Sequence, residues 1–207
     1  MKKHNKVLLA VLCAALLVVA TVCGTLAYFT DQEAVLNTFT VGKVDIDLNE
    51  TDVDGDQNTK ANAYHLIPGQ SYVKDPTVTV EAGSEASYIR MLVTPSNLEA
   101  LVNAFPEFVA EDGVFLLQNL VEGWNPAVWE FVDCVDGVYE FRYFETADGA
   151  DGELAPLFEE IVVPTTANNA DMKVLAGMQI NVVAQAIQAE GFADADAAWA
   201  AFAIQHP

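Results

Sequence analysis

Cysteine and histidine are scarce in this chain of 207 residues, with three of each. Beyond an N-terminal apolar run, Cys134 is the only cysteine, so the rest of the chain cannot form an intrachain disulfide. No His or Lys lies near Cys134 in sequence to lower its pKa, which favours a packed thiol over a nucleophile. The chain also lacks HExxH, GxSxG and a glycine-rich phosphate loop. We therefore predict no catalytic residue, although chance pairs among the many carboxylates remain open.

Positive charge is the second scarcity. Nine Lys and Arg face thirty Asp and Glu, giving a formal net charge of −21. Such a surface repels the phosphate backbone of nucleic acid, so a nucleic-acid-binding function is excluded. The same charge favours solubility and predicts that close self-association needs salt or cations to screen it.

The N-terminus has the pattern of a secretory signal peptide. Lys2, Lys3 and Lys6 precede Val7 to Val22, a run without charge that is shorter than the roughly 20 residues of a transmembrane helix. The small residues that follow predict cleavage between Ala27 and Tyr28, so residues 1–27 are the predicted signal peptide. An uncleaved N-terminal anchor is the alternative. Both interpretations export residues 28–207, which then carry a net charge of about −24 because only three lysines are removed.

Beyond the signal peptide the dominant hydrophobic period is two, which is typical of half-buried strands. The turn Val135-Asp136-Gly137, between two aromatic runs, predicts a β-hairpin. The strands expected from this pattern are 39–48, 77–81, 88–93, 128–132, 138–144, 160–163 and 178–186.

Helix is sparse by comparison. The spacing predicts a short helix over 98–105, with Asn97 as N-cap, and a second over 195–204, with Asp194 as N-cap. Many short strands and few helices predict an all-β fold, an antiparallel jelly-roll-like β-sandwich with one or two short helices and an N-terminal signal-peptide helix. Residues 28–207 are predicted to form a single domain.

One polar loop has the spacing of a calcium site. Asp52, Asp54, Asp56 and Asn58 alternate as in positions 1, 3, 5 and 7 of an EF-hand loop. Gln57 replaces the glycine expected at position 6, and Ala63 replaces the acid expected at position 12. The simpler interpretation is a solvated loop without a cofactor; a weak Ca²⁺ site is the alternative.

Several segments resemble the TasA and camelysin family of Gram-positive surface proteins. The segments are GTLAYFTD at the predicted cut, NTFTVGKVDIDL after it, LIPGQSYVKDPTVTVEAGSEASYIRMLV, and NNADMKVLAGMQINVVAQAIQAEGF. The last one resembles the closing strand of the family. The middle of the chain, 97–164, is more similar to clostridial relatives than to TasA.

The resemblance implies a secreted jelly-roll protein of the cell surface or biofilm matrix, cut by a SipW-type signal peptidase and in contact with the membrane only before cleavage. It implies filaments built by donor-strand exchange, with residues 28–40 as the donor strand, beginning at Tyr28. Phe29, Val35 and Phe39 are the side chains of this strand that we expect to insert into pockets of the next subunit. Asp31 and Glu33 share the face of Phe29 and Val35, so strict inward alternation fails.

Two other functions stay open from the sequence. One is a monomeric adhesion module that binds other matrix or surface proteins. The other is a camelysin-like metalloprotease, for which no zinc motif exists; His65 and His206 are the histidines outside the predicted signal peptide.

Overall fold

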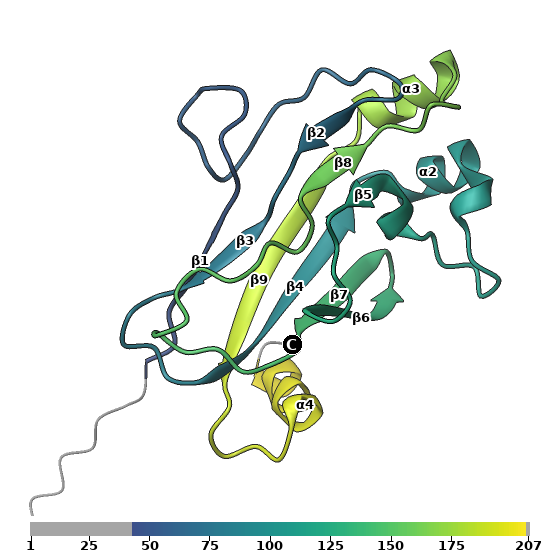
Figure 1. Cartoon of the computed structure of the whole chain (residues 1–207). Coiled ribbons are helices and arrows are strands. Elements are labelled where there is room, and N and C mark those ends of the chain that lie inside the picture. The colour runs from purple at the N-terminus through teal and green to yellow at the C-terminus, as the bar shows by residue number, and fades with distance from the viewer. Residues whose placement is uncertain (1–42, 206–207) are drawn as a thin grey trace, which may run out of the picture. The chain divides into compact units, whose positions relative to one another are not determined.

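The computed structural model describes residues 43–205 of the chain, and helices and strands are labelled in Figure 1. The predicted signal peptide, its cleavage site at Ala27 and Tyr28, and the predicted donor strand 28–40 lie outside these residues. Within residues 43–205, no helix is both long enough and apolar enough to span a bilayer.

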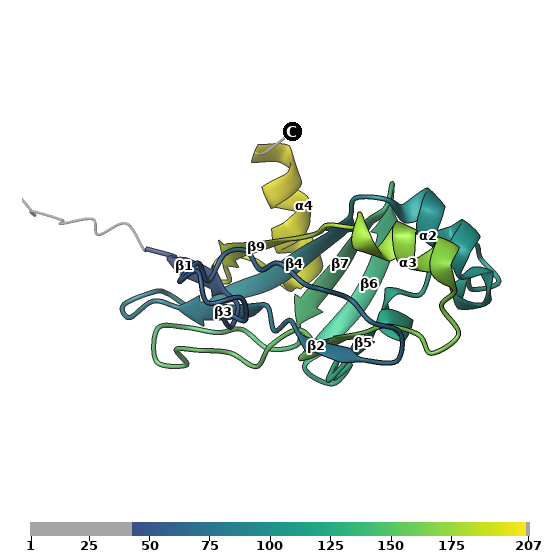
Figure 2. The same cartoon turned by 90° about the horizontal axis from the view of Figure 1, so that it is seen from above.

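The fold is all-β and antiparallel, as predicted. The larger sheet has the strand order β6-β7-β4-β9, formed by Trp129–Val135, Val138–Tyr143, Ser87–Pro95 and Ile180–Gln188. A second sheet has the order β2-β8-β5, formed by Ser71–Val73, Glu160–Val162 and Val121–Glu122. A two-stranded sheet joins β1 (Ile46–Asn49) to β3 (Thr77–Val80). The two smaller sheets lie on the same side of the larger one, and Figure 2 shows these layers.

The central strand β4 shows why the layers pack. Its residues alternate strictly in burial, with Ile89, Met91 and Val93 pointing into the core and fully buried. They meet Val78 and Val80 of β3 in one hydrophobic cluster that also contains Trp129 of β6. A second cluster, around Leu101, Phe105 and Phe115, fills the end of the sandwich beneath α2 and α3.

The predicted hairpin is confirmed as β6 and β7, joined at Asp136 and Gly137. Both turn residues have positive φ, 52° and 80°, as expected of a two-residue turn matched to the twist of a β-ribbon. The register shifts between Phe131 and Asp133, so the ribbon contains an irregularity that the sequence pattern does not show.

Three α-helices are present in the described residues, against one or two expected outside the signal peptide. Predicted helix 98–105 is α2 (Leu98–Ala104), but Asn97 makes no side-chain cap, so that detail was wrong. Predicted helix 195–204 is α4 (Ala195–Gln205), and Asp194 caps it by accepting a 2.9 Å hydrogen bond from the Ala197 N–H. The third helix, α3 (Asn169–Ala176), occupies part of the segment taken as the closing strand. Two 3₁₀ helices complete the fold, η1 (Pro106–Phe108) and η2 (Leu117–Leu120).

The capping box of α3 explains that error. The Asn168 side chain accepts hydrogen bonds from the backbone N–H groups of Ala170 and Asp171, and the Asp171 carboxylate accepts one from the Asn168 N–H. This local device starts a helix in the first part of that segment, whereas the predicted strand 178–186 is confirmed as β9, which begins after Gly177. The predicted strand 39–48 is likewise shorter in the described residues, where β1 is Ile46–Asn49.

Candidate functional site

A groove of about 880 Å³ lies along β9. β9 is an edge strand: it pairs through its whole length with β4 and has no strand on its other side within the described residues. Edge strands expose unpaired backbone N–H and C=O groups, which can pair with another strand. The groove therefore places a free strand edge beside an open space.

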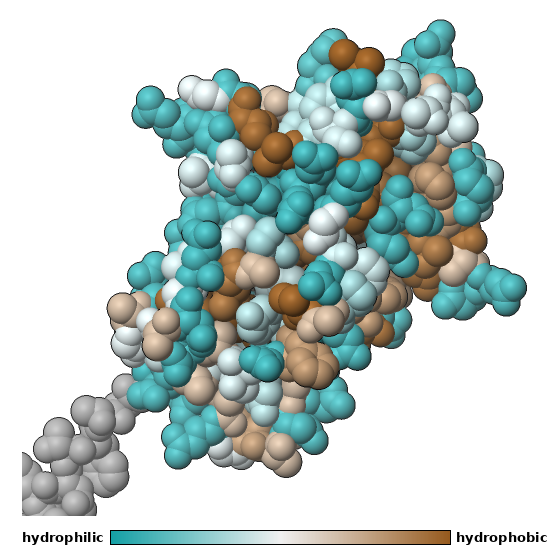
Figure 3. All heavy atoms as spheres, in the orientation of Figure 1, coloured by the Kyte–Doolittle hydropathy of each residue, from teal (hydrophilic) through white to brown (hydrophobic). Residues whose placement is uncertain are grey.

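Both walls of the groove contribute apolar side chains, which lie among polar ones. Ile180, Val182 and Ala184 face inward from β9 and are only partly buried although they touch the core. Leu48 of β1 and Leu66 stand opposite, and Ile161 and Val163, on and just after β8, contribute apolar side chains from the interior. In Figure 3, hydrophobic side chains reach the surface in patches between polar ones, as expected where the layers are not closed. The site offers both main-chain pairing and apolar side-chain contacts to an extended peptide.

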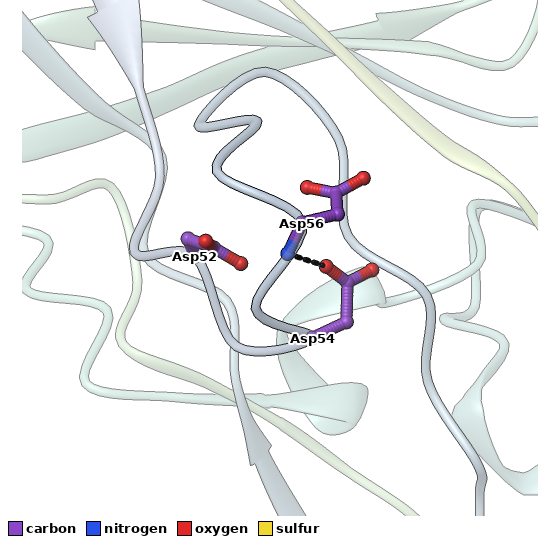
Figure 4. A group of neighbouring side chains, drawn as sticks. All are labelled: Asp52, Asp54 and Asp56. Atoms are coloured by element: carbon purple, nitrogen blue, oxygen red, sulfur yellow. Dashed lines mark hydrogen bonds between the residues drawn. The ribbon is translucent and has the colours of Figure 1, made fainter.

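The loop between β1 and β2 forms part of the rim of the groove and carries the predicted metal ligands. Asp52, Asp54 and Asp56 do come together, with ligand oxygens within 4.8 Å of one another. Figure 4 shows their carboxylates around the bend of the loop, with the Asp56 N–H donating to Asp54. The spacing in the sequence therefore predicted a real cluster.

The same carboxylates accept hydrogen bonds from backbone N–H groups of their own loop. Asp52 accepts from the N–H groups of Gly55 and Gln57, at 2.7 and 2.8 Å. Asp54 accepts from the Ala63 N–H at 2.8 Å, and this hydrogen bond is the main cause that lowers the pKa of its carboxyl. Asn58, the fourth predicted ligand, accepts from the Lys60 N–H at 3.0 Å. The cluster is exposed, and its order is explained by these turns without an ion.

A buried ion pair lines the deeper part of the groove. Lys74, directly after β2, places Nζ 2.5 Å from Glu50 Oε1, and both side chains are about nine-tenths buried. Tyr64 lies in the same wall, and burial together with the charges of Glu50 and Asp75 raises the pKa of its hydroxyl. Nothing in the sequence signalled this pair, because both residues lie in polar stretches.

The residues that could build a protease centre do not gather. His65 is exposed and belongs to no group of three metal-ligating side chains in residues 43–205. The aspartate cluster offers only carboxylate oxygens, a hard donor set suited to Ca²⁺ and lacking the nitrogen or sulfur ligands typical of zinc. Cys134 is half-buried, and burial raises the pKa of its thiol, opposite to the shift that activates a cysteine. The described residues thus do not fit a catalytic zinc.

Comparison with known proteins gives a family match for the N-terminal part of the chain. Residues 2–91 match the camelysin metallo-endopeptidase family. This match confirms the resemblance for less than half of the chain, from the predicted signal peptide into β4. No curated protein and no solved structure matches the chain. The camelysin match includes β1, the aspartate loop and Lys74, whereas the β9 wall of the groove lies beyond it.

Proposed function

We propose that this chain is a secreted structural protein of the bacterial cell surface or biofilm matrix that assembles into filaments. A SipW-type signal peptidase cuts after Ala27, and residues 28–40 of one copy then lie along β9 of the next. The observation that carries this proposal is the open groove at the β9 edge, which has the two features that strand addition requires. The camelysin match supports it by including the signal peptide and the donor segment.

The direction of the chain at Lys43 favours a donor from another copy. The Lys43 carbonyl accepts from the Glu85 N–H, and Asp45 accepts from the Glu81 N–H, so residues 43–45 extend β1 past the turn after β3. The groove begins at Asp47 and lies in the opposite direction along β1. Because residues 43–45 lie on the side of β1 away from the groove, we propose that the donor strand comes from the next copy.

Strand donation of this kind joins two different surfaces, the donor segment and the groove. Such heterologous contacts do not close when the rotation between copies is open, so they generate fibres rather than dimers. Each fibre therefore keeps one free donor segment at one end and one free groove at the other.

Electron microscopy of protein beginning at Tyr28 tests the proposal. We expect fibres at moderate salt, because salt screens the repulsion between acidic copies. Deleting residues 28–36 should abolish them while leaving the domain folded. A synthetic peptide of residues 28–40, added in excess, should block growth by occupying the grooves, and a peptide of the same composition in scrambled order is the control. Fibres that persist after the deletion would rule out donor-strand exchange.

A monomeric adhesion module is the alternative if the intact protein stays monomeric at all salt concentrations and still binds cell walls or matrix. The description of the family as a metallo-endopeptidase favours a third function, proteolysis. We assign no catalytic residue to it. Hydrolysis of casein by the purified protein, lost with a chelator and with His65→Ala, would support that function; hydrolysis unchanged in His65→Ala would remove the described histidine from any mechanism.

A further inference from the structure

Lys74 is the only charged residue counted as buried in the described part of the chain, with 7% of its surface exposed. An amine in such a position is costly unless it is paired, and its partner is Glu50 Oε1 at 2.5 Å. A buried amine in contact with a carboxylate can, however, act as a nucleophile, because the carboxylate can accept the proton that the ammonium group must lose.

The second carboxylate oxygen of Glu50, Oε2, faces the side-chain carboxamide of Asn62. Asn62 Nδ2 lies 3.4 Å from Glu50 Oε2 and donates at 2.9 Å to the Thr51 carbonyl. The carbonyl side of the same group is also held, because Asn62 Oδ1 accepts from the Val53 N–H at 2.9 Å. One carboxyl group thus contacts an amine through one oxygen and an amide nitrogen through the other, and all three side chains line the same groove.

We propose that Lys74 and Asn62 become joined by an intramolecular amide bond, with Glu50 moving the protons. Glu50 Oε1 accepts a proton from the Lys74 ammonium, and the neutral Nζ attacks Asn62 Cγ. The Nζ–Cγ bond forms and the Cγ–Nδ2 bond breaks. The departing nitrogen takes the proton held by Glu50 and a second proton from the attacking Nζ, and the products are one secondary amide and one ammonium ion, with no oxidant or other reactant needed.

The surroundings assist each stage of this condensation. The Val53 N–H donates to the oxygen on which negative charge develops during the attack. Burial of Glu50 and Lys74 keeps the proton within the pair, and the loop holds the carboxamide beside it. The reaction does not depend on filament formation.

The bond would fasten the aspartate-bearing loop to the end of β2 and so fix the rim of the groove. A covalent closure between residues 62 and 74 restricts the unfolded chain as a disulfide does. The chain cannot use a disulfide for this purpose, since Cys134 is its only cysteine after the predicted cut.

Peptide mass spectrometry of the purified full chain tests this inference, because trypsin cuts after Lys60, Lys74 and Arg90. With the bond formed, Lys74 is no longer a cleavage site, and a single peptide 61–90 appears with the mass of one ammonia missing. Fragmentation should give no backbone ions from cleavage between residues 62 and 74. Separate, unmodified peptides 61–74 and 75–90 from the folded wild-type protein would overturn the inference, whether or not fibres form.

Variants locate the bond. Asn62→Ala and Lys74→Arg should each yield unmodified peptides, and Glu50→Gln should abolish or greatly slow the loss of ammonia. Lys60→Arg is the matched control, because Lys60 is an exposed lysine paired with Asp47 and should leave the cross-link intact. Since removing one member of a buried pair can prevent folding, the wild-type digest decides the question by itself. Loss of ammonia that persists in Asn62→Ala would place the modification elsewhere and overturn the assignment.

Discussion

The guanidinium carbon of Arg90 lies 4.2 Å from the centre of the Trp199 ring, and this contact fixes α4 on the outer face of the larger sheet. Arg90 points outward from β4, where its Nη1 also contacts Glu140 at 3.1 Å. Trp199 is 3% exposed, and its indole N–H has no hydrogen-bond partner in the described residues. Figure 2 shows α4 on the side of the sheet opposite the smaller sheets. The helix is therefore held by packing, by the cation–π contact and by an ion pair between Arg142 Nη1 of β7 and Asp196 Oδ1 of α4, at 2.5 Å.

Trp199→Ala should lower the free energy of unfolding by about 3 kcal/mol, because it removes a buried aromatic side chain and leaves Arg90 without its ring contact. Trp199→Phe should cost less, since it keeps a ring and removes an unpartnered N–H. Urea unfolding of both variants measures the difference. Ile204→Ala is the control on the exposed side of α4, where 81% of the isoleucine surface is accessible. Equal stability of Trp199→Ala and wild type would contradict the packing role.

Alkaline pH should destabilise the domain through one buried tyrosine, Tyr139, and two half-buried ones, Tyr64 and Tyr143. Burial is the main cause that raises the pKa of Tyr64, Tyr139 and Tyr143, and nearby carboxylates add to the shift for Tyr64 and Tyr143. The unfolded chain ionises near the ordinary value of about 10, while the folded chain keeps these hydroxyls neutral. The contribution of these tyrosines to stability should thus be constant up to about pH 10 and fall above it, by up to about 1.4 kcal/mol per pH unit for the buried Tyr139 and by less for the partly exposed Tyr64 and Tyr143.

Tyr139→Phe isolates one of these groups. Tyr139 is 1% exposed and donates a 2.7 Å hydrogen bond to the Phe115 carbonyl, so the variant should lose about 1 kcal/mol at neutral pH. It should also show a shallower decline above pH 10. Thermal unfolding as a function of pH gives both values. A decline as steep as that of the wild type would mean that Tyr139 does not contribute to the pH dependence.

Val182→Lys should prevent fibre formation while leaving the domain folded. Val182 faces the groove from β9 and is only half-buried, so a lysine there places a charge where the donor side chains insert. Val132→Lys is the matched control, since Val132 of β6 is 40% exposed and does not line the groove. Microscopy and circular dichroism of the two variants make the comparison. If both variants form fibres as readily as the wild type, the acceptor lies elsewhere.

The aspartate loop should bind Ca²⁺ only weakly, with a Kd on the order of 10⁻³ M. The loop already satisfies Asp52 and Asp54 with backbone N–H groups, so an ion would have to share or displace these hydrogen bonds. Isothermal titration calorimetry measures the affinity, and Asp56→Asn should reduce any binding. Asp112→Asn, in another exposed loop, is the control. Micromolar affinity would contradict this expectation.

Local signals explain what could be predicted from the sequence. The hairpin at Asp136 and Gly137 was predictable because turn chemistry acts over two residues. The strand β4 and the helix α4 were predictable because their apolar periodicity extends over several residues. α3 was missed although the Asn168 and Asp171 capping box is a local signal, since the resemblance had assigned that stretch to a strand.

By itself, the sequence determined the acidic surface, the absence of disulfides, the antiparallel all-β class and the clustering of Asp52, Asp54 and Asp56, because these follow from composition or from residues close together in the chain. Only the tertiary structure decided that β9 is an edge strand with an open groove, and that Glu50 stands between Asn62 and Lys74. The period-two hydrophobic pattern shows that a strand is half-buried, but it does not show which other strands lie beside it. Those contacts depend on which distant segments pair when the layers pack.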